Sequence, residues 1–170
     1  LLALAWPLGR YIGRVLEGRA ERGKLRQLAE VYVYEVCGIN PTWEMNWKEY
    51  AGALIKFNLV GLIVLFVMLV GQGVVSSVPG LSWHQAFNVA VSFVTNTNWQ
   101  SYSGENSLTP LVQMVGLTVQ NFVSAATGLT VVLAMARGLS RASTTELGNF
   151  WADLTKALLY VLLPLSFVFS

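Results

Sequence analysis

Two long apolar stretches, residues 57–75 and 111–136, lie on either side of a polar segment. A helix needs about 20 predominantly apolar residues to cross the hydrocarbon core of a bilayer, and each stretch is long enough. Shorter apolar runs at 1–9 and 157–170 have the character of the end of one further span and the start of another. The pattern predicts an all-α membrane protein truncated at both ends, because neither terminal run has the length of a complete span.

A short apolar segment and a neutral polar loop lie between the two full spans. Residues 82–94 would form about 20 Å of helix, which is too short to cross a bilayer. Ser82 and Gln85 have the spacing of a capping box, which predicts the start of this helix. Residues 95–105 follow and carry many side-chain oxygens. Irregular backbone is tolerated inside a bilayer only where it is buried in protein or lines a cavity, so this loop is either a solvated outer loop or an ion-coordinating one.

Small and polar residues recur on one face of the second span. A stripe of this kind favours close packing against other helices, and a pore-lining stripe is the alternative. The residues of the stripe are Gln113, Gly116, Gln120, Ser124 and Thr127.

The basic residues are confined to two segments. Eight of the 11 Lys and Arg residues lie in 10–56 and three in 137–156, with none between them. The positive-inside rule places both segments in the cytoplasm, as linkers, and residues 76–110 outside. A hydrophobic content of 54% and a charged content of 12% agree with a membrane protein. Six acids nearly balance the eight bases of 10–56, which favours a solvated linker or a headgroup-facing helix over a nucleic-acid-binding segment.

Catalytic chemistry finds little support in the sequence. Residues 18–25 nearly spell a phosphate-binding loop, but Leu25 stands where Ser or Thr would hold magnesium, and no apolar strand precedes Gly18. Zinc-ligand spacing, a catalytic triad and a nucleophile elbow do not occur in the sequence. Cys37 is the single cysteine, so a disulfide framework is excluded. The sequence therefore predicts no ATP hydrolysis in this chain and no zinc site.

The order span, short helix, polar loop, span resembles one repeat of the potassium-channel architecture. Four motifs resemble those of the KdpA family, the potassium-binding, channel-like subunits of bacterial potassium-transporting P-type ATPases. They are Met-Asn-Trp-Lys at 45–48, Pro-Gly-Leu-Ser-Trp at 79–83, the block 92–105, and Gly-Leu-Thr-Val-Gln-Asn-Phe at 116–122. By this resemblance residues 57–136 form the first pore repeat, with a pore helix at 82–94 and a filter loop at 95–105.

The resemblance implies selection of potassium and its uptake across the bacterial inner membrane. The expected bound ion is K+, and no metal site other than one for potassium is expected. A KdpB-like catalytic subunit would hydrolyse ATP, KdpC-like and KdpF-like accessory subunits would complete the complex, and the lipid bilayer would surround it. Two alternatives stay open: a repeat of an ATP-independent potassium symporter or channel of the same superfamily, and a structural membrane subunit without an ion path.

A potassium filter must replace the hydration shell of the ion with a ring of oxygens. Glycine is absent from the loop before Gly104, and Asn tolerates the left-handed backbone conformation better than most residues, which is a reason for two Asn residues here. The expected filter residues are Thr95, Asn96, Thr97, Asn98, Trp99 and Gln100. Their expected supports are Ser101, Glu105, Gln113 and Gln120.

Overall fold

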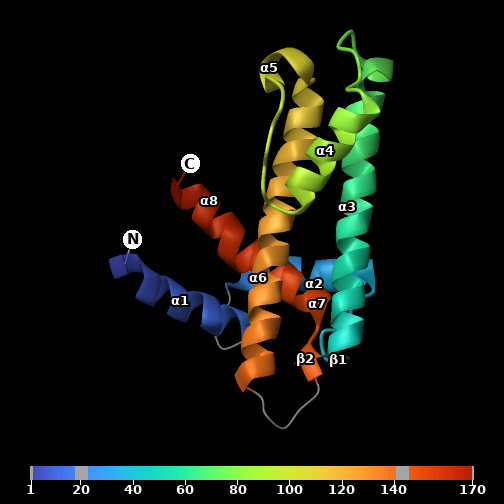
Figure 1. The fold of residues 1–170 in the computed structure, drawn as a ribbon. Coiled ribbons are helices and arrows are strands. Elements are labelled where there is room, and N and C mark those ends of the chain that lie inside the picture. The colour runs from blue at the N-terminus through green and yellow to red at the C-terminus, as the bar shows by residue number, and fades with distance from the viewer. Residues whose placement is uncertain (1, 18–22, 141–145, 170) are drawn as a thin grey trace. The chain divides into compact units, whose positions relative to one another are not determined.

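The computed structural model describes residues 2–17, 23–140 and 146–169 (Figure 1). The predicted segments 1–9, 10–56, 137–156 and 157–170 each include residues outside these ranges, and so does the near phosphate-binding loop at 18–25. The described chain forms two compact units, and the boundaries between them fall within the helices α3 and α6.

One unit, Leu54–Ala125, contains a short helix and its polar loop between two long helices (Figure 1). Its elements are the main part of α3 (Trp47–Val75), α4 (Trp83–Val94), α5 (Gly104–Ser107), the π-helical stretch η1 (Val112–Thr118) and the start of α6 (Val119–Ser140). Three helices of the described chain are long and apolar enough to cross a membrane. They are Trp47–Val75, Val112–Ser140 and Phe150–Val168.

The core of this unit forms on one face of α4. The buried side chains recur at helical spacing along it, at Ala86, Val89, Ala90 and Phe93. They pack in one cluster with Leu65 and Leu69 of α3 and with Val112 and Leu117 of η1. The short apolar segment predicted from the sequence is therefore a helix with one side anchored in the interior of the unit.

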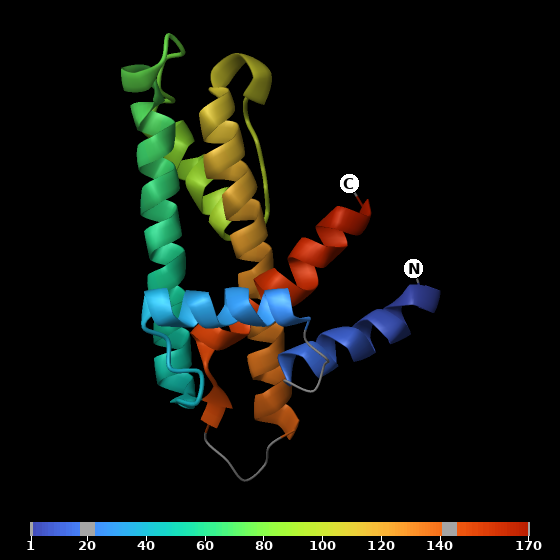
Figure 2. The same cartoon turned by 180° about the vertical axis from the view of Figure 1, so that it is seen from behind.

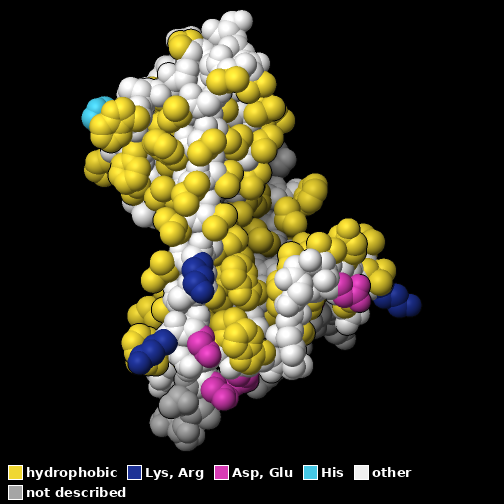
Figure 3. All heavy atoms as spheres, turned by 90° about the vertical axis from the view of Figure 1, so that its right-hand side faces the viewer, with side chains coloured by type: hydrophobic (Ala, Val, Ile, Leu, Met, Phe, Trp, Pro, Cys, Tyr) yellow, Lys and Arg dark blue, Asp and Glu magenta, His cyan; other side chains and the backbone are white. Residues whose placement is uncertain are grey.

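The outward face of α3 is apolar along the part that belongs to this unit. Leu59, Ile63 and Val67 are 53%, 51% and 59% exposed. Hydrophobic side chains cover much of the surface turned to the viewer in Figure 3. A face of this composition suits contact with lipid. Its side chains are apolar, and the backbone polar groups in the middle of a helix are hydrogen-bonded within the helix.

The other unit, Leu1–Ala53 with Ala126–Ser170, brings together segments that are far apart in the sequence. Asn149 links two of these segments. Its side-chain oxygen caps α7 by accepting hydrogen bonds from the N–H groups of Trp151 and Ala152, and its side-chain nitrogen donates to the carbonyls of Asn40 and Trp43. The elements that lie wholly in this unit are α1 (Leu2–Leu16), α2 (Lys24–Cys37), β1 (Met45–Asn46), β2 (Glu146–Gly148), α7 (Phe150–Lys156), the π-helical stretch η2 (Ala157–Leu162) and α8 (Leu163–Phe169).

The prediction of a purely helical chain is wrong in one detail. β1 pairs with β2 in an antiparallel two-stranded sheet, with Met45 opposite Gly148 and Asn46 opposite Glu146. Strands of two and three residues are too short to show the alternation that predicts a strand. Gly148 has a φ of 100°, and a Cβ there would overlap the Arg137 guanidinium, so this sheet end needs glycine.

Several helices extend past the apolar stretches that predicted them. α3 begins at Trp47, before the predicted span 57–75, and the last long helix begins at Phe150, before residue 157. Hydropathy marks only the apolar part of a helix, and charged residues such as Lys48 and Asp153 occupy the first turns. The capping box is also wrong: α4 does begin after Ser82, but the Ser82 side chain makes no capping hydrogen bond.

Candidate functional site

Ser92, in the last turn of α4, holds the backbone of the polar loop that follows it. Its carbonyl oxygen accepts hydrogen bonds from the N–H groups of Thr97 (2.9 Å) and Asn98 (3.2 Å). Its hydroxyl oxygen accepts from the N–H of Trp99. Ser92 is only 6% exposed. Three successive backbone N–H groups therefore point to a single buried residue.

The carbonyl groups of the same peptides point the other way. The C=O and N–H of a trans peptide are directed oppositely, so the carbonyls of Asn96, Thr97 and Asn98 are turned away from Ser92. Within the described parts of the chain, no hydrogen bond is donated to the carbonyl oxygens of residues 95–99. The loop thus presents a row of backbone oxygens on one side, free of donors from the described residues.

Two asparagines adopt the left-handed conformation that this arrangement needs. Asn96 has a φ of 59° and Asn98 a φ of 54°, whereas Thr95 has a φ of −84°. Alternation between right-handed and left-handed backbone gathers successive N–H groups on one side. Asn adopts φ above zero at less cost than other residues with a Cβ. The sequence-based expectation for the two Asn residues is met in this backbone.

Side chains brace the start of the loop. The Thr95 hydroxyl donates to the carbonyl of Val91 (2.9 Å), and the Thr97 hydroxyl donates to the carbonyl of Ser92 (3.1 Å). The hydroxyl of Ser124 donates to Oδ1 of Asn96 (3.3 Å). The loop is therefore tied both to the end of α4 and to the first turns of α6.

Gln72, on α3, joins the two ends of the segment that carries the loop. Its Nε2 donates to the carbonyls of Pro79 and Ser107, at 2.8 Å each, and its Oε1 accepts from the N–H of Thr109 (3.1 Å). Gln72 is 3% exposed. Pro79 precedes α4 and Ser107 follows the loop. One buried amide therefore holds both ends of the segment 79–109 against α3.

The remaining predicted residues of the loop are exposed, as Thr95, Asn96, Thr97 and Asn98 are. Trp99, Gln100, Ser101 and Glu105 are exposed, Trp99 by 77%. Glu105 is the one acidic or basic residue in the loop 95–105.

The two glutamines predicted as supports differ from each other. Gln113 Nε2 donates to the carbonyls of Gly104 (3.0 Å) and Leu108 (3.2 Å), so it braces the end of the loop. Gln120 packs against Gly61 of α3, and its buried Nε2 has no partner among the described residues. The predicted polar stripe of the second span is buried at Gly116, Gln120, Ser124 and Thr127 and partly buried at Gln113.

Sequence reasoning missed Ser92 and Gln72. Each is a polar residue with apolar neighbours on both sides in its helix, and a polar side chain in such a segment of a membrane protein is expected to have a partner. That signal was available in the sequence. The partners were not, since Gln72 bonds to groups up to 37 residues away.

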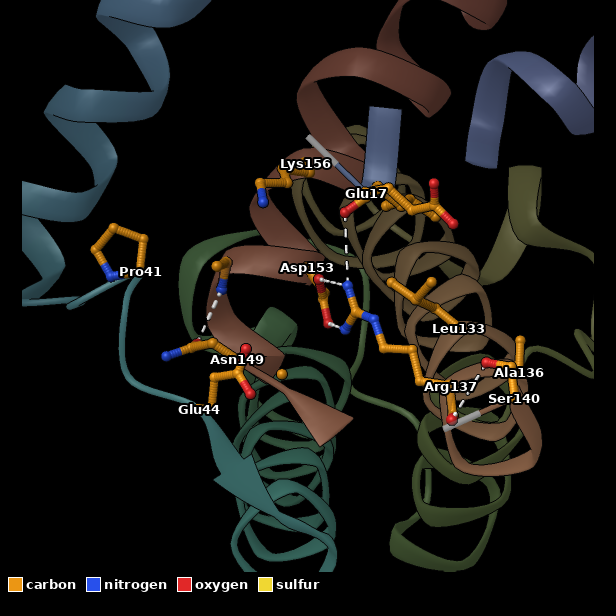
Figure 4. Close-up of a pocket in the computed structure, with 13 residues that line it drawn as sticks. Glu17, Pro41, Glu44, Leu133, Ala136, Arg137, Ser140, Asn149, Asp153 and Lys156 are labelled. Carbon is orange, nitrogen blue, oxygen red and sulfur yellow. Dashed lines mark hydrogen bonds and ion pairs between the residues drawn. The ribbon is translucent and has the colours of Figure 1, made fainter. Parts of the chain in front are cut away.

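A second polar cluster lies in the unit that contains α7. Arg137 makes a bidentate pair with Asp153, at 2.6 Å and 3.1 Å, and donates to the carbonyl of Leu147 (2.8 Å). Tyr50 donates a hydrogen bond of 3.2 Å to the same carboxylate. Figure 4 shows the pair beside a cavity of about 430 Å³ that Glu44 and Lys156 also line. Since the two charges satisfy each other, the cluster acts as a structural tie.

The sequence matches relatives of known name along its whole length. The family model described as potassium-transporting ATPase A subunit, KdpA, matches residues 1–170. The "potassium-transporting ATPase potassium-binding subunit" of Pseudomonas syringae pv. tomato is 56% identical over 177 residues, covering 100% of this chain and 31% of the relative. The protein of the same name from Desulfovibrio desulfuricans is 51% identical, covering 100% of this chain and 30% of its own length.

The chain thus spans about a third of the length of these relatives. The resemblance predicted from the four sequence motifs is confirmed, because the family match covers every residue that carries them. The chain belongs to the family of the potassium-transporting ATPase A subunit, KdpA.

Proposed function

We propose that residues 95–100 line the ion path of a potassium-transporting ATPase and supply one side of its potassium filter. The unit Leu54–Ala125 is then a pore repeat, with α4 as its re-entrant pore helix and the outer parts of α3 and α6 as its spans. Potassium is the transported substrate. ATP hydrolysis belongs to another subunit of the complex, a KdpB-like one, with KdpC-like and KdpF-like subunits completing it.

The row of backbone oxygens carries this proposal. A dehydrated potassium ion needs several neutral oxygens, and the carbonyls of Asn96, Thr97 and Asn98 face one side without a donor in the part of the chain that the structure describes. The C-terminal end of α4 lies directly before them, and its partial negative charge favours a cation. A solvated surface loop would have no need of three N–H groups fixed on one buried serine.

Membership of an ATPase subunit family favours ATP-driven uptake over an ATP-independent symporter or channel. The charge distribution supports the orientation, with 10–56 and 137–156 in the cytoplasm and 76–110 on the outer side of the bacterial inner membrane. In this orientation the loop end of the Leu54–Ala125 unit receives potassium from outside.

The direct test places a positive charge on the loop. Gln100→Arg in the complete transport complex is expected to raise the potassium concentration for half-maximal ATP hydrolysis. Two unit charges about 8 Å apart at an effective dielectric constant of about 20 repel by about 2 kcal/mol, which corresponds to roughly a 30-fold rise. The measurement is ATP hydrolysis by the purified complex over a range of potassium concentrations.

Gln100→Met is the matched control, because it removes the amide without adding charge. It should change the half-activating concentration much less than Gln100→Arg does. An unchanged potassium requirement in a well-assembled Gln100→Arg complex would place residues 95–100 off the ion path.

Ser92→Ala tests the backbone arrangement itself. The substitution removes the hydroxyl acceptor of the Trp99 N–H, and the net loss of one such hydrogen bond is about 1 kcal/mol. If the loop relaxes to recover this bond, the carbonyl row is lost, and discrimination of potassium over sodium should fall by roughly tenfold. Ser77→Ala, at an exposed serine before α4, should leave the discrimination as it is. Equal selectivity of both variants would mean that Ser92 does not shape the filter.

A further inference from the structure

The helix α2 carries an apolar stripe that faces away from the rest of its unit. Leu25, Leu28, Tyr32 and Val36 are 81%, 67%, 68% and 66% exposed. Their spacing of i, i+3, i+7 and i+11 places them on one helix face. Four large side chains on a single face form a continuous apolar surface, which is more than the scattered apolar residues of an ordinary protein surface.

Another face of α2 is fixed to its own unit. Glu30, only 3% exposed, accepts hydrogen bonds from the hydroxyl groups of Tyr34 (2.7 Å) and Tyr160 (2.6 Å). The helix is therefore held in one rotation about its axis, and the stripe cannot turn inward to become buried.

The contact with Tyr160 places α2 at the depth of a membrane boundary. Tyr160 belongs to the helix Phe150–Val168, which is long and apolar enough to cross a bilayer. Lys156 is the last charged residue of this helix, and Tyr160 lies four residues, about 6 Å, further along it. The hydrocarbon region begins where the charges end, so the Glu30 side of α2 lies beside the transition from headgroups to acyl chains.

The orientation of α2 agrees with that depth. Figures 1 and 2 show α2 crosswise to the part of α6 that belongs to the same unit. A helix that lies crosswise to a membrane-spanning helix runs along the membrane plane. Residues 38–46 connect α2 to the membrane-spanning helix α3, and the exposed aromatics Trp43 and Trp47 lie at that junction, as interface residues do.

Charge supports a lipid surface rather than a protein one. Arg10, Arg14, Lys24 and Arg26 are exposed on α1 and α2. Of the two acids of α2, Glu30 is buried and hydrogen-bonded, and Glu35 is exposed near the C-terminal end of the helix, away from Lys24 and Arg26. Exposed bases beside an apolar stripe complement a leaflet that contains anionic phospholipids.

We propose that α2 is an interfacial helix of the cytoplasmic leaflet. Its stripe of Leu25, Leu28, Tyr32 and Val36 lies among the acyl chains, and Lys24 and Arg26 bind the phosphate groups of anionic lipids. This assignment rests on the membrane orientation given above and not on the potassium filter, so either can fail without the other.

The experiment places an environment-sensitive fluorophore on each face of α2. Leu28→Cys and Gln27→Cys are made in the complete complex with Cys37 and other reactive cysteines removed, and each is labelled with nitrobenzoxadiazole. The complexes are reconstituted into vesicles of phosphatidylcholine with phosphatidylglycerol. Nitroxide groups on the lipid acyl chains should quench the probe at position 28 several-fold more than the matched probe at the exposed position 27. Aqueous iodide should show the reverse preference.

Two results would overturn the proposal. Equal quenching of both probes by iodide would mean that the stripe is solvated. Protection of the position 28 probe from both quenchers would mean that another subunit covers it. Val36→Cys repeats the test on the stripe if Leu28→Cys does not assemble.

The basic residues have their own test in the same assay. Lys24→Gln with Arg26→Gln should abolish any gain in lipid quenching between vesicles of pure phosphatidylcholine and vesicles that contain phosphatidylglycerol. A gain that persists in the double variant would remove the two bases from the assignment.

Discussion

Replacing Arg137 with Met is expected to destabilise the unit that contains α7 by about 3–5 kcal/mol, because it leaves the Asp153 carboxylate buried without its partner. Asp153 is 2% exposed, so its carboxylate depends on the hydrogen bonds that the protein supplies. Arg137 also donates to the carbonyl of Leu147, in the strand β2, and to the carbonyl of Leu16 at the end of α1. The loss should therefore loosen several chain segments at once. The measurement is the midpoint of thermal unfolding of the detergent-solubilised complex.

Two further variants separate charge from shape in this prediction. Arg137→Met combined with Asp153→Leu should recover part of the lost stability, because no unpaired charge remains. Lys56→Met, at an exposed base, should shift the midpoint little. If Arg137→Met is as stable as Lys56→Met, the ion pair does not hold these segments together.

Replacing Gln72 with Leu is expected to be the most damaging neutral change near the polar loop. The carbonyls of Pro79 and Ser107 and the N–H of Thr109 all lose their partner, and the unsatisfied buried N–H of Thr109 by itself costs about 1–3 kcal/mol. The two ends of the loop segment are then free to separate from α3. We expect the potassium concentration for half-maximal ATP hydrolysis to rise and discrimination over sodium to fall, while subunit assembly persists.

The matched control is Gln27→Leu, which makes the same exchange at an exposed glutamine of α2. It should leave both the potassium requirement and the selectivity unchanged. A Gln72→Leu complex that retains normal selectivity would show that closure of the loop segment at α3 is dispensable. A complex with lower thermal stability but unaltered selectivity would give Gln72 a purely structural role.

Much of the helical pattern could be predicted from the sequence, because transfer of apolar side chains from water to lipid is a local property of each segment. The long helices around 57–75 and 111–136 and the short helix at 82–94 follow directly from it. The ends of these helices did not follow, since hydropathy says nothing about charged turns outside the hydrocarbon. The two short strands were not predicted either, because Met45 and Gly148 become neighbours only when the chain folds.

For the candidate site, too, some features could be predicted from the sequence and others depend on the tertiary structure. The sequence by itself determined the family, the neutral character of the loop and the two Asn positions where left-handed backbone is least costly. Only the tertiary structure decided that Ser92 gathers three N–H groups and that Gln72 joins Pro79, Ser107 and Thr109. Hydropathy and backbone preference belong to individual residues, whereas a hydrogen bond requires a particular partner within about 3 Å, and that partner is set by how distant segments pack.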